Sequence, residues 1–340
     1  MDIDTFIRAL PKAELHMHLE GSIEPELLLD LAARNGLRTR WETPEALRAA
    51  YEFTDLQSFL DLYYEGCRVL MKERDFYDMT RAYLRSAHAD AVVRAELFLG
   101  PQSFIERNIP LAAVMDGVLA AIRDAERDDG ISAGLLVSAQ RHRSEAEALA
   151  LLDSVMPWAD RIAGFGLGGA ERGNPPARFA NYFRACRERG FRITVHAGEE
   201  GPAAYVREAV ELLDTDRIDH GNSCLDDPAL VRVLAQRRTP LTVCPLSNVR
   251  LKGVSSLAEH PLPAMLAAGL NVTLNSDDPA YFGGTVNDNF IQCRQMFGLT
   301  GETVVALARN SLTAAFAPPA ERSRHLARLD AYVAAHPIHS

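Results

Sequence analysis

The fold of this 340-residue chain is limited most by a regular alternation along the sequence. Short runs of β-branched and apolar residues alternate with longer amphipathic stretches, which is typical of βαβ units around a parallel sheet. Eight strands over this length predict a (β/α)8 TIM barrel, whose active site is built at the carboxyl ends of the strands. The alternative is a doubly wound open sheet, which would gather its site at one crevice. The eight expected strands are residues 13–18, 92–99, 131–137, 162–167, 192–196, 217–219, 240–244 and 272–275.

The sequence between and around these runs bears on the number of domains. No internal repeat, low-complexity tract or linker separates two parts, so we expect residues 1–340 to form a single domain. Residues 23–85 are too long for a simple crossover and carry apolar residues at helical spacing, among them Leu27, Leu31 and Phe59. We therefore expect a helical insertion after the first strand. Our hypothesis is that it also covers the mouth of the barrel and excludes water during catalysis.

Composition narrows the class of partner. The formal net charge of -10 opposes nucleic acid or an anionic membrane as the main partner. We therefore expect a small-molecule ligand. No apolar run approaches the roughly 20 residues of a membrane span, and the first residues are acidic, so we expect a cytosolic protein. The five cysteines contain no Cys-x-x-Cys pair, which argues against a disulfide framework.

Two histidines in the first expected strand suggest a metal site. His16 and His18 are two residues apart, a spacing that points both imidazoles to one face of a strand. His196 ends another expected strand, and Asp277 follows a third. Three imidazoles and one carboxylate suit a borderline metal such as zinc, with an open position for water. Because such a metal lowers the pKa of bound water from about 15.7 toward about 7, the set predicts hydrolysis.

Two further residues lie where they can serve such a reaction. Glu199 comes three residues after His196, beyond a glycine that lets the backbone turn, and this position suits a proton donor. His220 ends the sixth expected strand, where it can orient the water or take its proton. The alternative for His220 is a hydrogen-bonded structural histidine.

Six short motifs occur together, in one order, over nearly the whole chain. They are HMHLEG at 16–21, GLGG at 166–169, HAGE at 196–199, DHG at 219–221, CPLSN at 244–248 and SDDP at 276–279. With these motifs, the chain resembles the adenosine and adenine deaminases of the amidohydrolase superfamily. The resemblance implies a (β/α)8 barrel with one catalytic Zn2+ per chain, bound by His16, His18, His196 and Asp277.

The same resemblance implies roles for the neighbours of these ligands. It implies that Glu199 protonates N1 of a purine, that His220 acts on the attacking water, that Asp278 contacts N7 and that the backbone of Gly169 donates toward N3. A purely structural role remains an alternative for two of these residues. Asp278 precedes a proline and suits a helix N-cap or a turn, and Gly169 suits a tight turn.

Glu20 bears on which purine is the substrate. Adenosine deaminases usually carry Asp at this place, where it meets the ribose, whereas Glu20 is one methylene longer and would intrude on the space of the sugar. Glu20, Asn222 and residues 276–284 resemble the adenine deaminase branch. The resemblance therefore implies deamination of adenine to hypoxanthine and ammonia in purine salvage. Adenosine, an N6-substituted adenine or another 6-aminopurine nucleoside remains an alternative substrate.

Two alternatives belong to other classes of protein. A metal hydrolase acting on an amide or phosphoester would use the same metal, but Glu199 and the pair Asp277–Asp278 supply groups that a deaminase needs. A non-catalytic purine-binding protein is the second alternative, since a fold does not guarantee turnover. The sequence does not indicate the oligomeric state, the metal loaded in the cell, or regulation.

Overall fold

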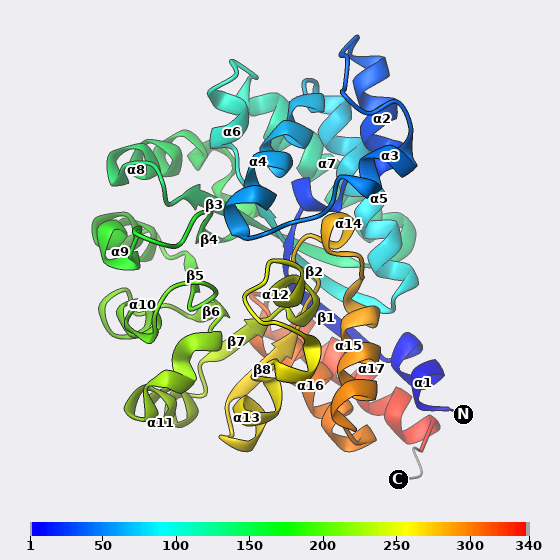
Figure 1. Cartoon of the computed structure of the whole chain (residues 1–340), viewed down its shortest axis with the longest axis vertical. Coiled ribbons are helices and arrows are strands. Elements are labelled where there is room, and N and C mark those ends of the chain that lie inside the picture. The colour runs from blue at the N-terminus through cyan, green and yellow to red at the C-terminus, as the bar shows by residue number, and fades with distance from the viewer. Residues whose placement is uncertain (1, 338–340) are drawn as a thin grey trace.

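A sheet of eight parallel strands lies at the centre of the computed structural model, which describes residues 2–337 (Figure 1). Each strand pairs with the next one in the sequence. The ring closes where the His18 N–H donates to the Asp277 carbonyl at 2.8 Å and the Asp277 N–H donates to the His16 carbonyl at 3.1 Å. The predicted (β/α)8 barrel is therefore confirmed. The doubly wound sheet is excluded, because the consecutive strand order has no switch point.

The strands lie close to their predicted places. Only the third ends more than one residue from its predicted position: it was expected to stop at residue 137, but it continues to Gln140. The hydrophobic run in the sequence ends before Ser138. The strand nevertheless continues, because Ser138, Ala139 and Gln140 pair with Gly166, Leu167 and Gly168 of the next strand. The strands are β1 (Lys12–His18), β2 (Val92–Leu99), β3 (Ser132–Gln140), β4 (Ile162–Gly168), β5 (Arg192–Ala197), β6 (Arg217–His220), β7 (Pro240–Val243) and β8 (Asn271–Leu274).

Helices surround the strands, and local sequence sets many of their ends. Ser144 and Glu147 form a capping box at the start of α8, and Gly130 ends α7 with a φ of 71°. Asp227 accepts two N–H groups at the start of α11. The barrel helices are α5 (Glu73–Ala89), α7 (Leu111–Asp129), α8 (Glu145–Ser154), α9 (Ala180–Glu188), α10 (Ala203–Arg207), α11 (Pro228–Arg237), α13 (Leu262–Ala267) and α16 (Gly301–Ala314).

The segment after β1 contains the expected insertion, which is shorter than residues 23–85. Its last helix, α5, packs on β2 and α7 and is therefore the first helix of the barrel itself. The insertion consists of α2 (Pro25–Arg34), α3 (Pro44–Ala49), α4 (Leu56–Gly66) and the short turn η2 (Cys67–Val69). The remaining segments are α1 (Ile3–Ala9), α6 (Gln102–Ile105), α12 (Pro245–Arg250), α14 (Pro279–Phe282), α15 (Val286–Phe297), α17 (Pro319–Ala335), η1 (Glu20–Ser22), η3 (Met156–Arg161), η4 (Pro176–Phe179), η5 (Glu208–Leu212), η6 (Asn222–Asp226) and η7 (Leu257–Glu259).

The interior of the barrel is polar as well as apolar. Glu96 of β2 and Arg217 of β6 are both buried, and they form an ion pair of 2.6 Å. The guanidinium of Arg217 also donates to the Leu15 carbonyl at 3.1 Å. Each buried charge therefore has a partner, as buried charges require. The pair also links β2 to β6, which are not neighbours in the sheet.

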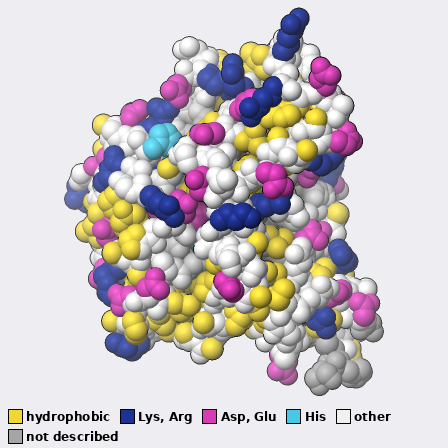
Figure 2. All heavy atoms as spheres, in the orientation of Figure 1, with side chains coloured by type: hydrophobic (Ala, Val, Ile, Leu, Met, Phe, Trp, Pro, Cys, Tyr) yellow, Lys and Arg dark blue, Asp and Glu magenta, His cyan; other side chains and the backbone are white. Residues whose placement is uncertain are grey.

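The surface mixes side chains of both signs. Figure 2 shows Lys and Arg interspersed with Asp, Glu and apolar groups on the face seen in Figure 1. Among the described residues, no helix combines the length and the apolar character needed to cross a bilayer. All five cysteines lie within the described part of the chain and are buried free thiols, so the expectation of no disulfide framework is confirmed.

Candidate active site

The four predicted metal ligands meet at the carboxyl ends of β1, β5 and β8. A ligand atom from each of them lies within 4.8 Å of the others. Asp277 Oδ1 is 3.3 Å from His16 Nε2 and 3.4 Å from His18 Nε2, and His18 Nε2 is 3.2 Å from His196 Nε2. Asp277 reaches this place with a φ of 66°, which turns the chain sharply after β8.

The surroundings of these side chains fit a metal ion. Nδ1 of His16 lies 3.0 Å from the Thr242 hydroxyl, which leaves Nε2 of His16 buried without a hydrogen-bond partner. Nδ1 of His196 lies 3.3 Å from the Asp219 carboxylate. Metal-ligating histidines usually use their second nitrogen in this way. Three Nε2 atoms and one carboxylate that converge on a point are a donor set for a divalent cation.

Glu199 and His220 lie beside this cluster. Glu199 Oε2 is 3.6 Å from His220 Nε2, which is 3.8 Å from Asp277 Oδ2. Burial, together with the negative charge of Asp277, raises the pKa of Glu199 well above its ordinary value. Burial and the charge of nearby His16 lower the pKa of His220 well below its ordinary value. These two shifts favour a protonated Glu199, which has a proton to give, and a neutral His220, which is able to accept one.

Asp278 and Gly169, the two predicted substrate contacts, both line one cavity. Asp278 takes the N-cap position of α14, but its side chain makes no capping bond, and its Oδ1 is buried without a partner. Burial, followed by the charge of Asp277, raises the pKa of Asp278 well above its usual range, so the group can donate an O–H bond. Gly169 lines the cavity with a φ of 94°, a conformation that favours glycine.

Glu20 lies behind the cavity and is not among the residues that line it. Its carboxylate accepts the N–H of Gly100 at 2.9 Å, and the backbone of Gly100 lines the cavity in its place. Burial raises the pKa of Glu20 to about 7, while the Gly100 N–H opposes that shift. Glu20 therefore acts on the cavity through Gly100.

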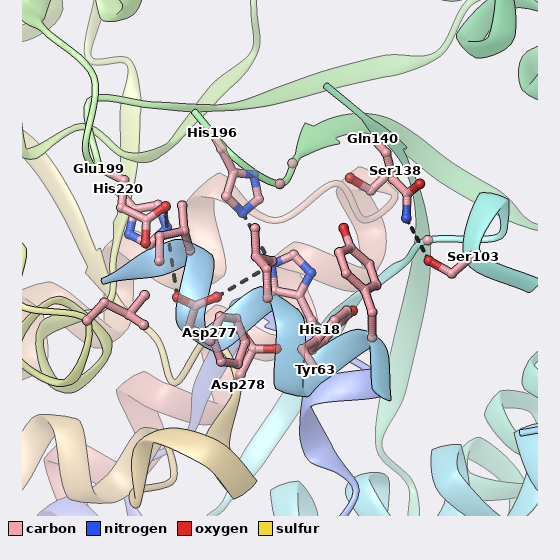
Figure 3. A pocket seen from close by; sticks show the side chains of 18 of the residues that line it. His18, Tyr63, Ser103, Ser138, Gln140, His196, Glu199, His220, Asp277 and Asp278 are labelled. Atoms are coloured by element: carbon pink, nitrogen blue, oxygen red, sulfur yellow. Dashed lines mark hydrogen bonds and ion pairs between the residues drawn. The ribbon is translucent and has the colours of Figure 1, made fainter. Parts of the chain in front are cut away.

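One cavity brings most of these groups together. Glu199, Asp277 and Asp278 line it together with His18, His196 and His220, as Figure 3 shows. Five residues of α4 cover it from the side of the insertion: Leu56, Phe59, Leu60, Tyr63 and Tyr64. A small planar molecule in this space would be shielded from bulk water by α4 while its polar edge faces the carboxyl groups.

Two buried charged residues that the sequence did not single out hold the site in place. One carboxylate oxygen of Glu171 accepts the Gly198 N–H at 2.7 Å, and the other accepts the N–H groups of residues 199, 200 and 201 at 2.8–3.0 Å. Arg141 donates to the His196 carbonyl at 2.7 Å. Neither residue belongs to one of the six sequence motifs. The only sequence signal is that Glu171 follows the glycine-rich end of β4.

The fold and the site together define a metal-dependent hydrolase built on a (β/α)8 barrel. More specifically, the chain belongs to the adenosine deaminase family, whose profile matches residues 11–332.

The relatives found by comparison agree with this membership. An adenine deaminase of Rhodopseudomonas palustris is 63% identical over 339 residues, which cover 100% of this chain and 99% of that protein. The crystal structure of adenine deaminase from Arthrobacter aurescens is 48% identical, with a TM-score of 0.94 over 96% of this chain and 100% of that one. An amidohydrolase from Burkholderia ambifaria with bound Zn is 30% identical, with a TM-score of 0.90 over 98% and 94% of the two chains.

Proposed function

We propose that this protein is a zinc-dependent adenine deaminase that converts adenine and water to hypoxanthine and ammonia in purine salvage. The observation that carries the proposal is that the four-residue donor set converges beside one cavity, where three of its members, His18, His196 and Asp277, line the same space as Glu199 and Asp278. Relatives with 63% and 48% identity over nearly the full chain are named adenine deaminases, which supports the free base as substrate.

The proposed metal is one Zn2+ per chain, held by His16, His18, His196 and Asp277. Three nitrogens and one carboxylate suit Zn2+ better than Mg2+ or Ca2+, which prefer oxygen ligands. When bound, it supplies Lewis acidity that makes water nucleophilic at neutral pH. The relative from Burkholderia ambifaria, which binds Zn, supports this choice.

The protein's own residues carry the proton steps of the proposed reaction. Water adds to C6 of adenine while Glu199 donates a proton to N1, so that the ring accepts the electron pair. His220 accepts a proton from the attacking water. His220 then returns this proton to the amino group, which leaves as ammonia, while the C6 hydroxyl gives its proton back to Glu199 and becomes the carbonyl of hypoxanthine. Asp278 donates to N7, and the N–H of Gly169 donates toward N3, which hold the base in this orientation.

The proposal is tested by incubating the zinc-loaded protein separately with adenine, adenosine and N6-methyladenine and by analysing the amine and the purine product. We expect preferential conversion of adenine to hypoxanthine. A preference for adenosine would overturn the substrate, and no turnover of any of the three would overturn the assigned activity. A Glu199→Gln protein should retain zinc and bind hypoxanthine but lose turnover by about a hundredfold or more.

A further inference from the structure

The end of the cavity away from Glu199 is closed by polar side chains. Figure 3 shows Glu199 and His220 at one end, with Ser103, Ser138 and Gln140 at the opposite end. Gln140 is the last residue of β3, and Ser103 lies on α6. These two side chains meet across the gap between the two segments.

A continuous set of hydrogen bonds holds this end shut. The Gln140 amide Nε2 donates to the Ser103 hydroxyl at 2.6 Å, and Arg143 Nε donates to Gln140 Oε1 at 2.7 Å. The Gln140 backbone N–H donates to the side-chain oxygen of Gln102 at 2.8 Å. Both atoms of the Gln140 amide are therefore engaged, which fixes its orientation.

The other side of the closure is anchored to Glu20 of η1, the turn that follows β1. The Ser103 N–H donates to the Gly100 carbonyl at 3.2 Å, and the Gly100 N–H donates to the Glu20 carboxylate. One chain of contacts thus runs from η1 after the first strand to the end of the third strand, through Glu20, Gly100, Ser103, Gln140 and Arg143. We call Ser103 and Gln140, held in this way, the N9 wall.

A second cavity lies directly beyond the N9 wall. It shares Tyr64, Ser103 and Gln140 with the active-site cavity as lining residues. Arg68 and His142 are among its other lining residues. The wall between the two spaces is therefore a single layer of side chains, with room behind it for a group larger than a methyl.

We propose that the N9 wall makes the protein specific for purine bases that carry no substituent on N9. This inference rests on the proposed function and deepens it. With C6 at the metal ligands and Glu199 at N1, N9 lies on the far side of the ring system from C6 and faces Ser103 and Gln140. A ribose on N9 must displace both side chains and break the hydrogen bond between them. Glu20 then contributes by anchoring Gly100 rather than by filling the sugar space itself.

The first test uses the wild-type protein and 9-methyladenine, which adds the smallest possible group at N9. We expect kcat/KM for 9-methyladenine to be lower than for adenine by about tenfold or more, and hypoxanthine to bind more tightly than inosine in calorimetric titrations, which need no turnover. Equal use of adenine and 9-methyladenine would overturn the wall. If adenine is not converted but hypoxanthine still binds in preference to inosine, the proposed function fails and the wall stands.

The second test removes the N9 wall with the double variant Ser103→Gly/Gln140→Ala. We expect the ratio of kcat/KM for 9-methyladenine to that for adenine to rise by about tenfold or more, because the two cavities then join. The matched control is Gln140→Met, which keeps the volume of the side chain but cannot donate to Ser103. An equal rise in the control, or no rise in a folded double variant, would overturn the proposal. If the double variant does not fold, the measurement on the wild type still decides it.

Discussion

Glu171 illustrates how a residue outside the cavity can control one inside it. Its two carboxylate oxygens accept four consecutive backbone N–H groups, from Gly198 through Gly201, and Glu199 lies within that turn. Glu171 is only 1% exposed. A carboxylate can accept all four bonds, whereas an amide has one accepting oxygen and its NH2 group faces donors. Glu171 is therefore a positioning residue for Glu199.

We predict that Glu171→Gln lowers kcat by about tenfold to a hundredfold, because the turn shifts and Glu199 loses its alignment with the substrate. Steady-state kinetics, with zinc content measured in parallel, check this. The matched control is Glu145→Gln, because Glu145 also accepts backbone N–H groups, from Asn181 and Tyr182, but lies outside the cavity. A loss of thermal stability in Glu171→Gln with unchanged kcat would assign the residue a purely structural role.

Asp219 supports the proposed metal ligand His196 in the same indirect manner. Its Oδ1 accepts the hydroxyls of Thr194 and Thr242 at 2.7 and 2.9 Å, while Oδ2 faces Nδ1 of His196 at 3.3 Å. Although burial opposes it, contact with His196 holds the pKa of Asp219 far below its ordinary value. The charged carboxylate thus fixes the ring of His196 with Nε2 toward the donor set.

Replacing Asp219 by Asn is predicted to weaken metal binding by about tenfold to a hundredfold. Competition with a chelator of known affinity measures this directly, without reference to turnover. Asp216→Asn is a suitable control, because Asp216 precedes the same strand but pairs with Arg187 and Arg192 at the opposite end of the barrel. Equal metal affinity in wild type and Asp219→Asn would contradict the orienting role.

Residues of the site differ in how far the sequence could predict them. His16 and His18 stand out because their spacing alone places two imidazoles on one face of a strand. Glu171 and Arg141 act through backbone atoms of residues 27 or more positions away. Such contacts depend on the turns that the loops adopt, and no spacing or periodicity encodes them.

At the scale of elements, the sequence pattern located all eight strands but missed the polar end of the third. The pattern stops at residue 137, whereas β3 continues to Gln140 through pairing with β4. The omitted residues Ser138 and Gln140 both line the cavity. In a barrel, the carboxyl ends of the strands are where polar side chains replace apolar ones, so a hydrophobic signal ends where the site begins.

The helix α4 is joined to the helix that follows Asp278 by an aromatic cluster. The ring centroid of Phe59 lies 4.7 Å from that of Phe282 and 5.5 Å from that of Tyr281, both on α14. Phe59 also lies 5.5 Å from Tyr63, its neighbour on α4. These contacts hold the cover over the cavity against the segment that carries Asp278.

Truncating this anchor by Phe59→Ala is predicted to raise KM for adenine by about tenfold, because the variant loses about 3–5 kcal/mol of packing where α4 meets α14. Amide hydrogen exchange in residues 56–66 should speed up, while exchange in β1 stays slow. Leu47→Ala in α3 is the matched control, since Leu47 is buried in the same insertion but does not line the cavity. Unchanged KM and exchange would show that α4 is held by other contacts.

At the scale of the molecule, helices near the two ends of the described chain lie side by side. Tyr332 of α17 donates to the Phe6 carbonyl of α1 at 3.0 Å, and their rings lie 5.1 Å apart (Figure 1). The Ala13 N–H at the start of β1 donates to the Ser311 hydroxyl of α16 at 2.9 Å. Because segments from both ends pack on one barrel, we propose that residues 1–340 form a single domain.

Lys12 makes the folding stability of the chain depend on pH. Its ammonium is buried at the start of β1, where it donates to the Asp90 carbonyl at 2.7 Å and to the Asn287 side-chain oxygen at 2.8 Å. Burial lowers the pKa of Lys12 to about 7, against the attraction of Asp90 and Glu14. In the unfolded chain, the pKa of a lysine is about 10.4. Between these two values the unfolded chain binds more protons than the folded one, so the free energy of unfolding rises with pH.

We therefore predict that the free energy of unfolding of the wild type, minus that of Lys12→Met, increases between about pH 7 and pH 9 by up to about 1.4 kcal/mol per pH unit. Below about pH 7 the difference should be flat, because Lys12 is then protonated in both states and the full cost of burying its charge is present. Urea unfolding at several pH values measures the difference, in which groups common to both proteins cancel. A flat difference up to pH 9 would mean that the hydrogen bonds to Asp90 and Asn287 stabilise the buried ammonium enough for it to keep its proton.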